Sequence, residues 1–371
     1  MKRVLCLSAV MFLLMILTAP DALAYEISIF DESVEELKNS LSDEARERLN
    51  ALGVDDPEDV DRIQIADVFQ RITDELSEAL TGPMPSMALV IAALLIVSLL
   101  EGYTDSLRHT QMKEIMGAVT SLFLTASLVS PLSGLLKSAV VVIDGASALM
   151  TIYLPLMVGM MVFTGRFIQV GGYYATVMTA AHVISWLAST VLSPLLTAYL
   201  AVSSCAGLSS RIRIKGFCDM AYRFVKWSLT FVMSIFTAIL ALQTVTAGAA
   251  DSVASRAARF TLSSMIPVVG AAVSEAYKTL QSSVNLLRSG VGVFALLGLM
   301  ASFLPVILRV LAWQVTLQLS RHTAVVLNVD SAAAVLDSLS SVLSMLTAIM
   351  VSVALVFVIS TASLLTIGGA S

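Results

Sequence analysis

Apolar segments of about twenty residues recur from residue 84 to the end of the chain, separated by short polar stretches. Each is close to the length that a helix needs to cross roughly 30 Å of hydrocarbon. Helices satisfy their own backbone groups inside a bilayer, so uninterrupted apolar runs of this length predict membrane-spanning helices. We predict six full crossings, at residues 84–100, 115–136, 173–200, 227–248, 291–308 and 342–367.

Two further apolar segments, 138–164 and 249–288, contain residues that interrupt a membrane-spanning helix. The first holds Asp144, Pro155 and Gly159, and the second holds a charged window described below. Broken helices are tolerated in a bilayer only where protein or a water-filled cavity satisfies the freed backbone groups. The expected fold is therefore all-α: a polytopic membrane protein with about six full transmembrane helices and two Pro/Gly-broken or re-entrant segments.

Residues 1–24 have the layout of a cleavable secretory signal peptide. Lys2 and Arg3 precede an apolar run that ends at the small residues Ala22 and Ala24. The alternative is an uncleaved first membrane helix. In either case residue 25 onward is expected to be exported.

Residues 25–83 are acidic, with 17 acidic and 5 basic side chains, and their apolar positions recur at helical spacing. Leu37, Leu41 and Leu49 belong to one such stripe. We predict a small exported helical region that is either a docking surface for partners or a solvated tether. The sequence Thr-Gly-Pro-Met-Pro at its end breaks the helix and marks the start of a multispan membrane domain, residues 84–371.

Basic residues in short loops mark the cytoplasmic side of a membrane. The segment 209–226 holds five basic residues and one acidic residue, so we expect it in the cytoplasm. With residue 25 outside, a single crossing by 173–200 satisfies this orientation if 138–164 dips into the membrane and returns. Three crossings before the basic segment fit equally well.

The chain carries a candidate internal repeat of 112 residues, 115–226 and 227–338. A shift by this length lays Pro155 on Pro267, and each proline is followed three to four residues later by a glycine. Both halves begin on the cytoplasmic side, so the repeat is parallel; the alternative is a chance resemblance between apolar sequences. Paired Pro/Gly interruptions are typical of transporters, so a self-contained small-molecule transporter is one hypothesis for function.

The charged window in the second broken segment is the main candidate for a functional region. Its candidate residues are Asp251, Arg256, Arg259, Pro267, Gly270 and Glu275. Asp251, Arg259 and the serine between them recur every four residues, which predicts either an interfacial helix or the polar lining of an aqueous pathway. Asp144, Pro155 and Gly159 on the first broken segment are a second candidate for the same lining, the alternative being a position at the membrane surface.

No constellation of residues indicates catalysis or metal binding. His109, His182 and His322 are scattered along the chain, and there is no phosphate-binding loop motif. We therefore expect no enzyme activity, no cofactor and no nucleic-acid partner, and an ATP-driven process needs its ATPase on another chain. Composition supports a lipid bilayer as the solvent, because 57% of residues are hydrophobic and 13% are charged, against about a quarter charged in soluble proteins.

Residues 244–298, TVTAGAADSVASRAARFTLSSMIPVVGAAVSEAYKTLQSSVNLLRSGVGVFALLG, combine several features at fixed spacing. They join an aspartate, an arginine two to three turns later, a Pro-Val-Val-Gly, an acidic residue, and a basic residue before a glycine-rich span. This stretch resembles the signature of the stage III sporulation protein AE family. The resemblance extends over nearly the whole chain, including the signal and the acidic exported segment.

The resemblance implies a protein of the mother-cell membrane that surrounds the engulfed forespore of a sporulating bacterium. Family members belong to a secretion-like assembly that sustains late forespore gene expression. The partners implied are sibling stage III sporulation membrane and ring proteins, a cytoplasmic ATPase of the same operon, and a channel protein from the forespore side. The resemblance attaches no catalytic residues to the chain.

Overall fold

The helical nature of the chain is plain in a computed structural model. It describes residues 32–63, 65–106, 110–163, 167–192, 222–242 and 270–369, with a few single positions between 194 and 220. All regular structure in this part of the chain is helical, as the sequence predicts. The predicted signal peptide, residues 1–24, lies outside the described residues.

The acidic N-terminal region is folded. Its helical segments are residues 32–40, α2 (Asp43–Asn50), the 3-10 helix η1 (Pro57–Arg62) and α3 (Ile65–Thr81). Ser42 caps α2, because its hydroxyl accepts a hydrogen bond from the Ala45 backbone N–H at 3.2 Å. The predicted apolar stripe is buried, with Leu37, Leu41 and Leu49 at 5% exposure or less. The region is therefore packed on the rest of the molecule and is not a solvated tether.

A turn at Gly82 and Pro83 separates α3 from α4 (Met84–Ser106), where the sequence predicts the boundary. α4 has 23 residues, which is about 34 Å and matches one bilayer thickness. Its exposed side chains include Leu89, Leu95, Ile96, Leu99, Leu100 and Tyr103. Bulky apolar side chains on an exposed helix face are typical of contact with lipid.

Three helices are much longer than one crossing. They are α5 (Thr110–Phe163), α9 (Gly270–Val326) and α10 (Asp330–Gly369), with 54, 57 and 40 residues. At about 1.5 Å per residue, each extends for roughly 60 to 85 Å, at least twice the hydrocarbon thickness of a bilayer. Each of these helices is therefore longer than one membrane crossing requires.

α5 joins two segments that the sequence predicts to be separate, 115–136 and 138–164. The break predicted at Pro155 is wrong, because the helix continues through it. A proline removes one backbone N–H, but neighbouring helices can compensate for that loss within a membrane bundle. The side chains beside it, such as Tyr153 and Leu154, are fully buried and hold the helix in line.

α9 also differs from the prediction. It begins at Gly270 and continues without interruption through the predicted span 291–308. The described part of segment 249–288 is therefore continuous helix, and the part before Gly270 lies outside the described residues. The candidate repeat, whose second half includes that part, stays a prediction.

The remaining described helices are α6 (Phe167–Trp186), a π-helical turn η2 (Leu187–Leu192), and a helix over residues 222–242. The predicted span 173–200 changes from α-helix to π-helix at Leu187. π-helical turns are uncommon and occur mostly as short insertions within α-helices. Pro194, two residues beyond this turn, cannot donate the backbone hydrogen bond that a regular helix needs.

Five helices of the described chain are long and apolar enough to cross a membrane, against six predicted crossings. They are Ala66–Tyr103, Ile115–Val162, Tyr222–Leu242, Val284–Val326 and Asp330–Leu365. The chain is thus a multi-pass membrane protein by helix length and composition.

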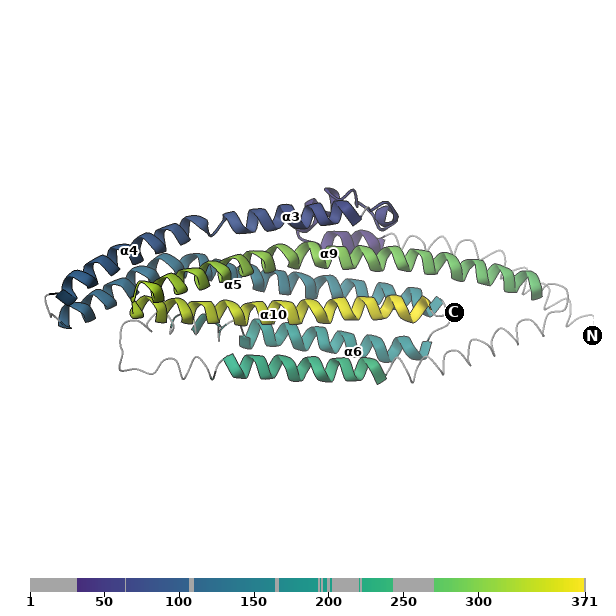
Figure 1. Ribbon diagram of the computed structural model, residues 1–371. Helices are drawn as coiled ribbons and strands as arrows, with labels where there is room; N and C mark the ends of the chain where they lie inside the picture. The colour runs from purple at the N-terminus through teal and green to yellow at the C-terminus, as the bar shows by residue number, and fades with distance from the viewer. Residues whose placement is uncertain are drawn as a thin grey trace, which may run out of the picture.

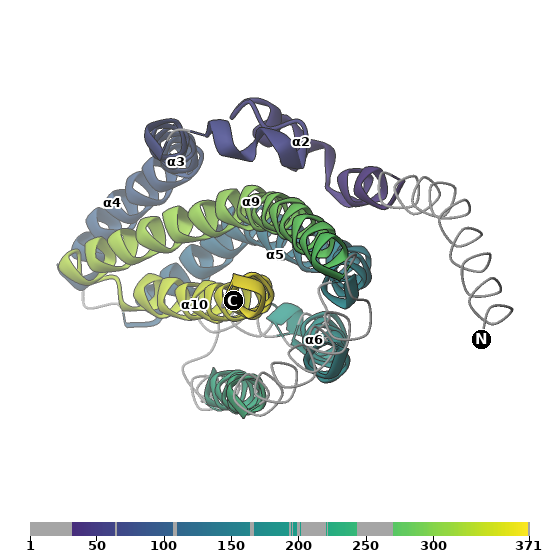
Figure 2. The same cartoon turned by 90° about the vertical axis from the view of Figure 1, so that its right-hand side faces the viewer.

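The helices form an elongated bundle, with α9 between the N-terminal helices on one side and α10 and α5 on the other (Figure 1). The view along the bundle shows α6 on the side of α10 away from α9 (Figure 2). α9 and α10 pack against each other more extensively than any other described pair. At one end α4 lies beside the α9–α10 turn, where the Ser98 hydroxyl donates to the Leu327 carbonyl at 3.1 Å.

Candidate functional site along helix α9

The acidic N-terminal region touches α9 at two glycines. A Cβ atom added at Gly290 falls 2.8 Å from the Pro57 carbonyl oxygen, and one added at Gly298 falls 2.7 Å from the Leu41 side chain. Real Cβ atoms essentially never approach another heavy atom closer than 3.0 Å. The absence of a side chain at these two positions therefore lets the N-terminal region lie directly on the α9 backbone.

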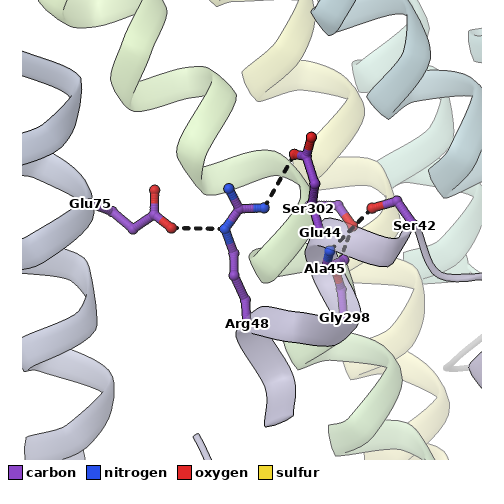
Figure 3. A network of polar contacts seen from close by, with 7 residues as sticks. All are labelled: Ser42, Glu44, Ala45, Arg48, Glu75, Gly298 and Ser302. Carbon is purple, nitrogen blue, oxygen red and sulfur yellow. Dashed lines mark hydrogen bonds and ion pairs between the residues drawn. The ribbon is translucent and has the colours of Figure 1, made fainter. Parts of the chain in front are cut away.

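Polar contacts join the N-terminal helices α2 and α3 to each other beside this surface (Figure 3). The Arg48 guanidinium of α2 donates from Nε to Glu75 Oε1 of α3 at 2.8 Å, and it lies 3.6 Å from Glu44 within its own helix. Arg48 and Glu75 are about three-quarters buried, so their ion pair is less screened by solvent than an exposed one. On α9, the Ser302 hydroxyl donates to the Gly298 carbonyl at 2.8 Å.

The opposite side of the same α9 segment holds a buried arginine. Arg288 is 2% exposed, and its Nη2 donates to the Leu365 carbonyl in the last two turns of α10 at 2.8 Å. The carboxyl end of a helix carries partial negative charge, so a cation there stabilises it. A Cβ at Gly292 would clash with the Leu365 side chain, so this glycine also permits close packing of α9 on α10.

Two tyrosines complete a buried polar cluster around Arg288. Tyr173 of α6 donates its hydroxyl to the Ser360 carbonyl of α10. Tyr153 of α5 is fully buried, close to Thr361 of α10 and within electrostatic range of Arg288. Hydrogen bonds thus join α9 and α6 to α10, and polar contacts of this kind help to fix helix positions in a membrane bundle.

Helix α9 connects the acidic N-terminal region to the end of α10. Between residues 288 and 298, α9 contacts the acidic N-terminal region on one side and the end of α10 on the other. Among the described residues, no group of three or more His, Cys, Asp or Glu side chains could hold a metal ion.

The predicted candidate residues lie in different places. Asp144 and Pro155 are exposed on α5, and Gly159 is half-buried on the same helix. Gly270 is the first residue of α9, and Glu275 lies in its first two turns. The others lie outside the described residues: Asp251, Arg256, Arg259 and Pro267. Because most of the second group lies outside the described residues, whether the two groups meet and whether either has a functional role stay predictions.

Sequence reasoning placed Leu41 in the buried stripe and Arg288 in the family signature, but it predicted none of the contacts that these residues make along α9. Arg288 carried a signal, because it is a lone charge just before the Gly-Val-Gly that opens the glycine-rich span. Tyr153 and Tyr173 carried none, since single tyrosines in apolar segments are also common at membrane interfaces.

The long apolar helices define a class, that of all-helical multi-pass membrane proteins. A family model described as "Stage III sporulation protein AE" matches residues 57–368 of the 371. The chain belongs to the stage III sporulation protein AE family. Neither a search of curated proteins nor a search of solved structures found a match.

Proposed function

We propose that the chain is a membrane subunit of the secretion-like channel complex between mother cell and forespore, which is needed for forespore development and late forespore gene expression. Membership of a stage III sporulation family supports a role at this stage. The observation that carries the proposal is the contact between the acidic region and α9 at Gly290 and Gly298. This contact places the acidic region directly on a helix of the membrane bundle.

The exported surface is suited to partners between the two membranes. Its exposed carboxylates include Glu32, Glu35, Glu36, Asp43, Glu44, Glu47, Asp55, Asp56, Glu58, Asp67, Asp74 and Glu78. Because the apolar side of the region is buried against α9, these carboxylates have a fixed orientation. The ring-forming siblings bind this surface in our proposal. The cytoplasmic ATPase binds on the opposite side of the membrane. The subunit lies in the mother-cell membrane around the forespore, with its signal removed.

Affinity purification from sporulating cells tests the proposal. The tagged chain should recover sibling stage III proteins, and its deletion should abolish a late forespore reporter. Changing Glu35, Glu36 and Glu47 to glutamine should lower recovery of the ring proteins while recovery of membrane siblings and the ATPase is unchanged. The three side chains are exposed and lack a described ion-pair partner, so the fold should tolerate the change.

The same preparation separates this function from a self-contained transporter. Purified chain in liposomes should show no solute flux, and wild-type cells should yield the chain bound to its siblings. Flux by the isolated chain, together with normal sporulation of the deletion strain, would contradict the proposal.

A further inference from the structure

An open groove runs between α10 and the helix over residues 222–242. Figure 2 shows helix 222–242 as the lowest helix in that view, on the side of α10 away from α9. The groove has a volume of about 650 Å³, and ligand pockets typically hold roughly 300 to 1,000 Å³. We call it the α10 groove, and its lining includes Lys226, Thr230, Ser234 and Thr237 of helix 222–242 and Ala348, Ser352 and Leu355 of α10.

The α10 groove is charged at one end and apolar at the other. Lys226 lies at one end, and Ala238 lines the groove more than three turns further along the same helix. Between them, the hydroxyls of Thr230, Ser234 and Thr237 each donate to a carbonyl of their own helix at 2.8 Å. These hydroxyls are satisfied without a ligand, so they can lie against apolar groups at little cost. An elongated site of this kind suits an amphiphile with a negatively charged head.

The charged end of the α10 groove has the features of a membrane interface. Tyr222 and Trp227 are exposed beside Lys226, and tyrosine and tryptophan are enriched at the level of the lipid headgroups. Arg223, also exposed, adds a second basic side chain at this end. Further along the helix the exposed side chains are bulky and apolar, as is typical of lipid contact: Phe231, Ile235, Ile239 and Leu242. Lys226 is therefore placed at the headgroup level, and the groove runs from there toward the hydrocarbon.

The charge of Lys226 favours an anion from outside the chain. Lys226 makes no ion pair with any described residue. The stretches of sequence on either side of helix 222–242 do not supply a matching charge, because 193–221 holds three basic residues against one acidic and 243–269 holds two against one. The basic segment 209–226 predicts that this end faces the cytoplasm. The cytoplasmic leaflet is rich in anionic lipids, and basic pockets between membrane helices on that side bind their headgroups.

We propose that the α10 groove binds one anionic phospholipid of the cytoplasmic leaflet. The lipid phosphate contacts Lys226, and an acyl chain lies along Ala238, Ala241 and Leu355. A zwitterionic phospholipid fits less well, because its own cationic group then lies near Lys226 and Arg223. The site requires insertion of the chain into a membrane and does not depend on partner subunits.

Lipid titration of the purified protein in neutral detergent, followed by native mass spectrometry, tests the site. The two probes are phosphatidylglycerol and phosphatidylcholine with identical acyl chains. One molecule of phosphatidylglycerol should bind in preference, and Lys226→Met should weaken its binding about tenfold or more, the effect of losing a hydrogen bond between charged groups. Lys137→Met is the matched control, because it removes an exposed lysine of α5 outside the groove, and it should leave the affinity unchanged. Equal affinity of the wild type for the two lipids, or unchanged affinity in Lys226→Met, would overturn the proposal.

A second pair of variants tests where the lipid lies. Ala238→Phe fills the apolar end of the groove, whereas Ile239→Phe changes an exposed neighbour that does not line it. Only Ala238→Phe should weaken the binding of phosphatidylglycerol, and equal affinities of the two variants would overturn the placement. Inorganic phosphate in excess should not displace the lipid. Displacement by phosphate would indicate a site for free anions and would overturn the lipid assignment.

Photo-crosslinking identifies the occupant of the groove in membranes. A photoreactive amino acid at Ser234, which lines the groove, should give an adduct with an anionic phospholipid. An adduct with another segment of this chain, with a second copy or with a different polypeptide would overturn the proposal. Co-purification of sibling proteins does not bear on this result, so failure of the lipid site is distinct from failure of the proposed function.

Discussion

A methyl group at Gly290 should loosen the acidic region from the membrane bundle. In a helix, glycine to alanine is normally stabilising by roughly 0.5 to 1 kcal/mol, because alanine loses less backbone entropy. At Gly290 the new methyl carbon lies 2.8 Å from the Pro57 carbonyl oxygen, a backbone atom that cannot rotate away. Overpacking of this kind costs about 1 to 3 kcal/mol.

Gly171 on α6 is the matched control, because a Cβ there meets nothing within 4 Å. The intrinsic helix gain is the same at both positions, so the free energy that holds the acidic region in place should differ by about 1 to 3 kcal/mol between the two variants. The assay is limited proteolysis of residues 32–83 in purified, detergent-solubilised protein. When opening is fast relative to cleavage, the cleavage rate follows the open population.

The expected result is cleavage about 5 to 150 times faster in Gly290→Ala than in Gly171→Ala, with cleavage sites confined to the acidic region. Equal cleavage rates in the two variants would refute the reasoning. They would mean that the acidic region does not lie on the α9 backbone in solution.

Substitutions at Arg288, Tyr173 and Leu49 test the remaining contacts in thermal unfolding of the purified protein. Arg288→Gln should destabilise the protein by about 1.5 to 3 kcal/mol, because it removes a charged hydrogen bond to the α10 carbonyl. Arg288→Lys keeps the charge and should recover part of this stability. Equal melting temperatures of the two variants would argue against a charge effect. Tyr173→Phe should cost about 1 kcal/mol, and an unchanged melting temperature would exclude its bond to Ser360. Leu49→Ala should cost about 2 to 5 kcal/mol, whereas alanine at the exposed Leu76 should be nearly neutral.

Local patterns were enough to predict several elements. The stripe containing Leu37 and Leu49 identified the buried side of the acidic helices, because helical spacing fixes which residues share a face. The break at Gly82 and Pro83 and the apolar run of α4 followed from the same local chemistry. The all-α fold followed from the requirement that backbone groups in lipid be satisfied within the helix.

Contacts distant in sequence could not be predicted in this way. Pro155 suggested a break, but burial of the side chains around it keeps α5 continuous, and that packing depends on α6, α9 and α10. Gly290 and Gly298 looked like ordinary glycines of an apolar span. Their partners, Pro57 and Leu41, lie more than 200 residues earlier, and nothing in the local pattern connects them.

The central claim is that the acidic N-terminal region is held on α9 while the protein functions in sporulating cells. The direct measurement is disulfide formation in sporulating cells between cysteines at Leu41 and Gly298, with serine replacing Cys6, Cys205 and Cys218. Under oxidation the cysteines at 41 and 298 should form a disulfide and so resist labelling by a maleimide polymer. A control pair of cysteines at 41 and 171 should remain open to labelling. Cells that carry the crosslinked protein should still sporulate. Full labelling of the first pair, or loss of sporulation on crosslinking, would contradict the account.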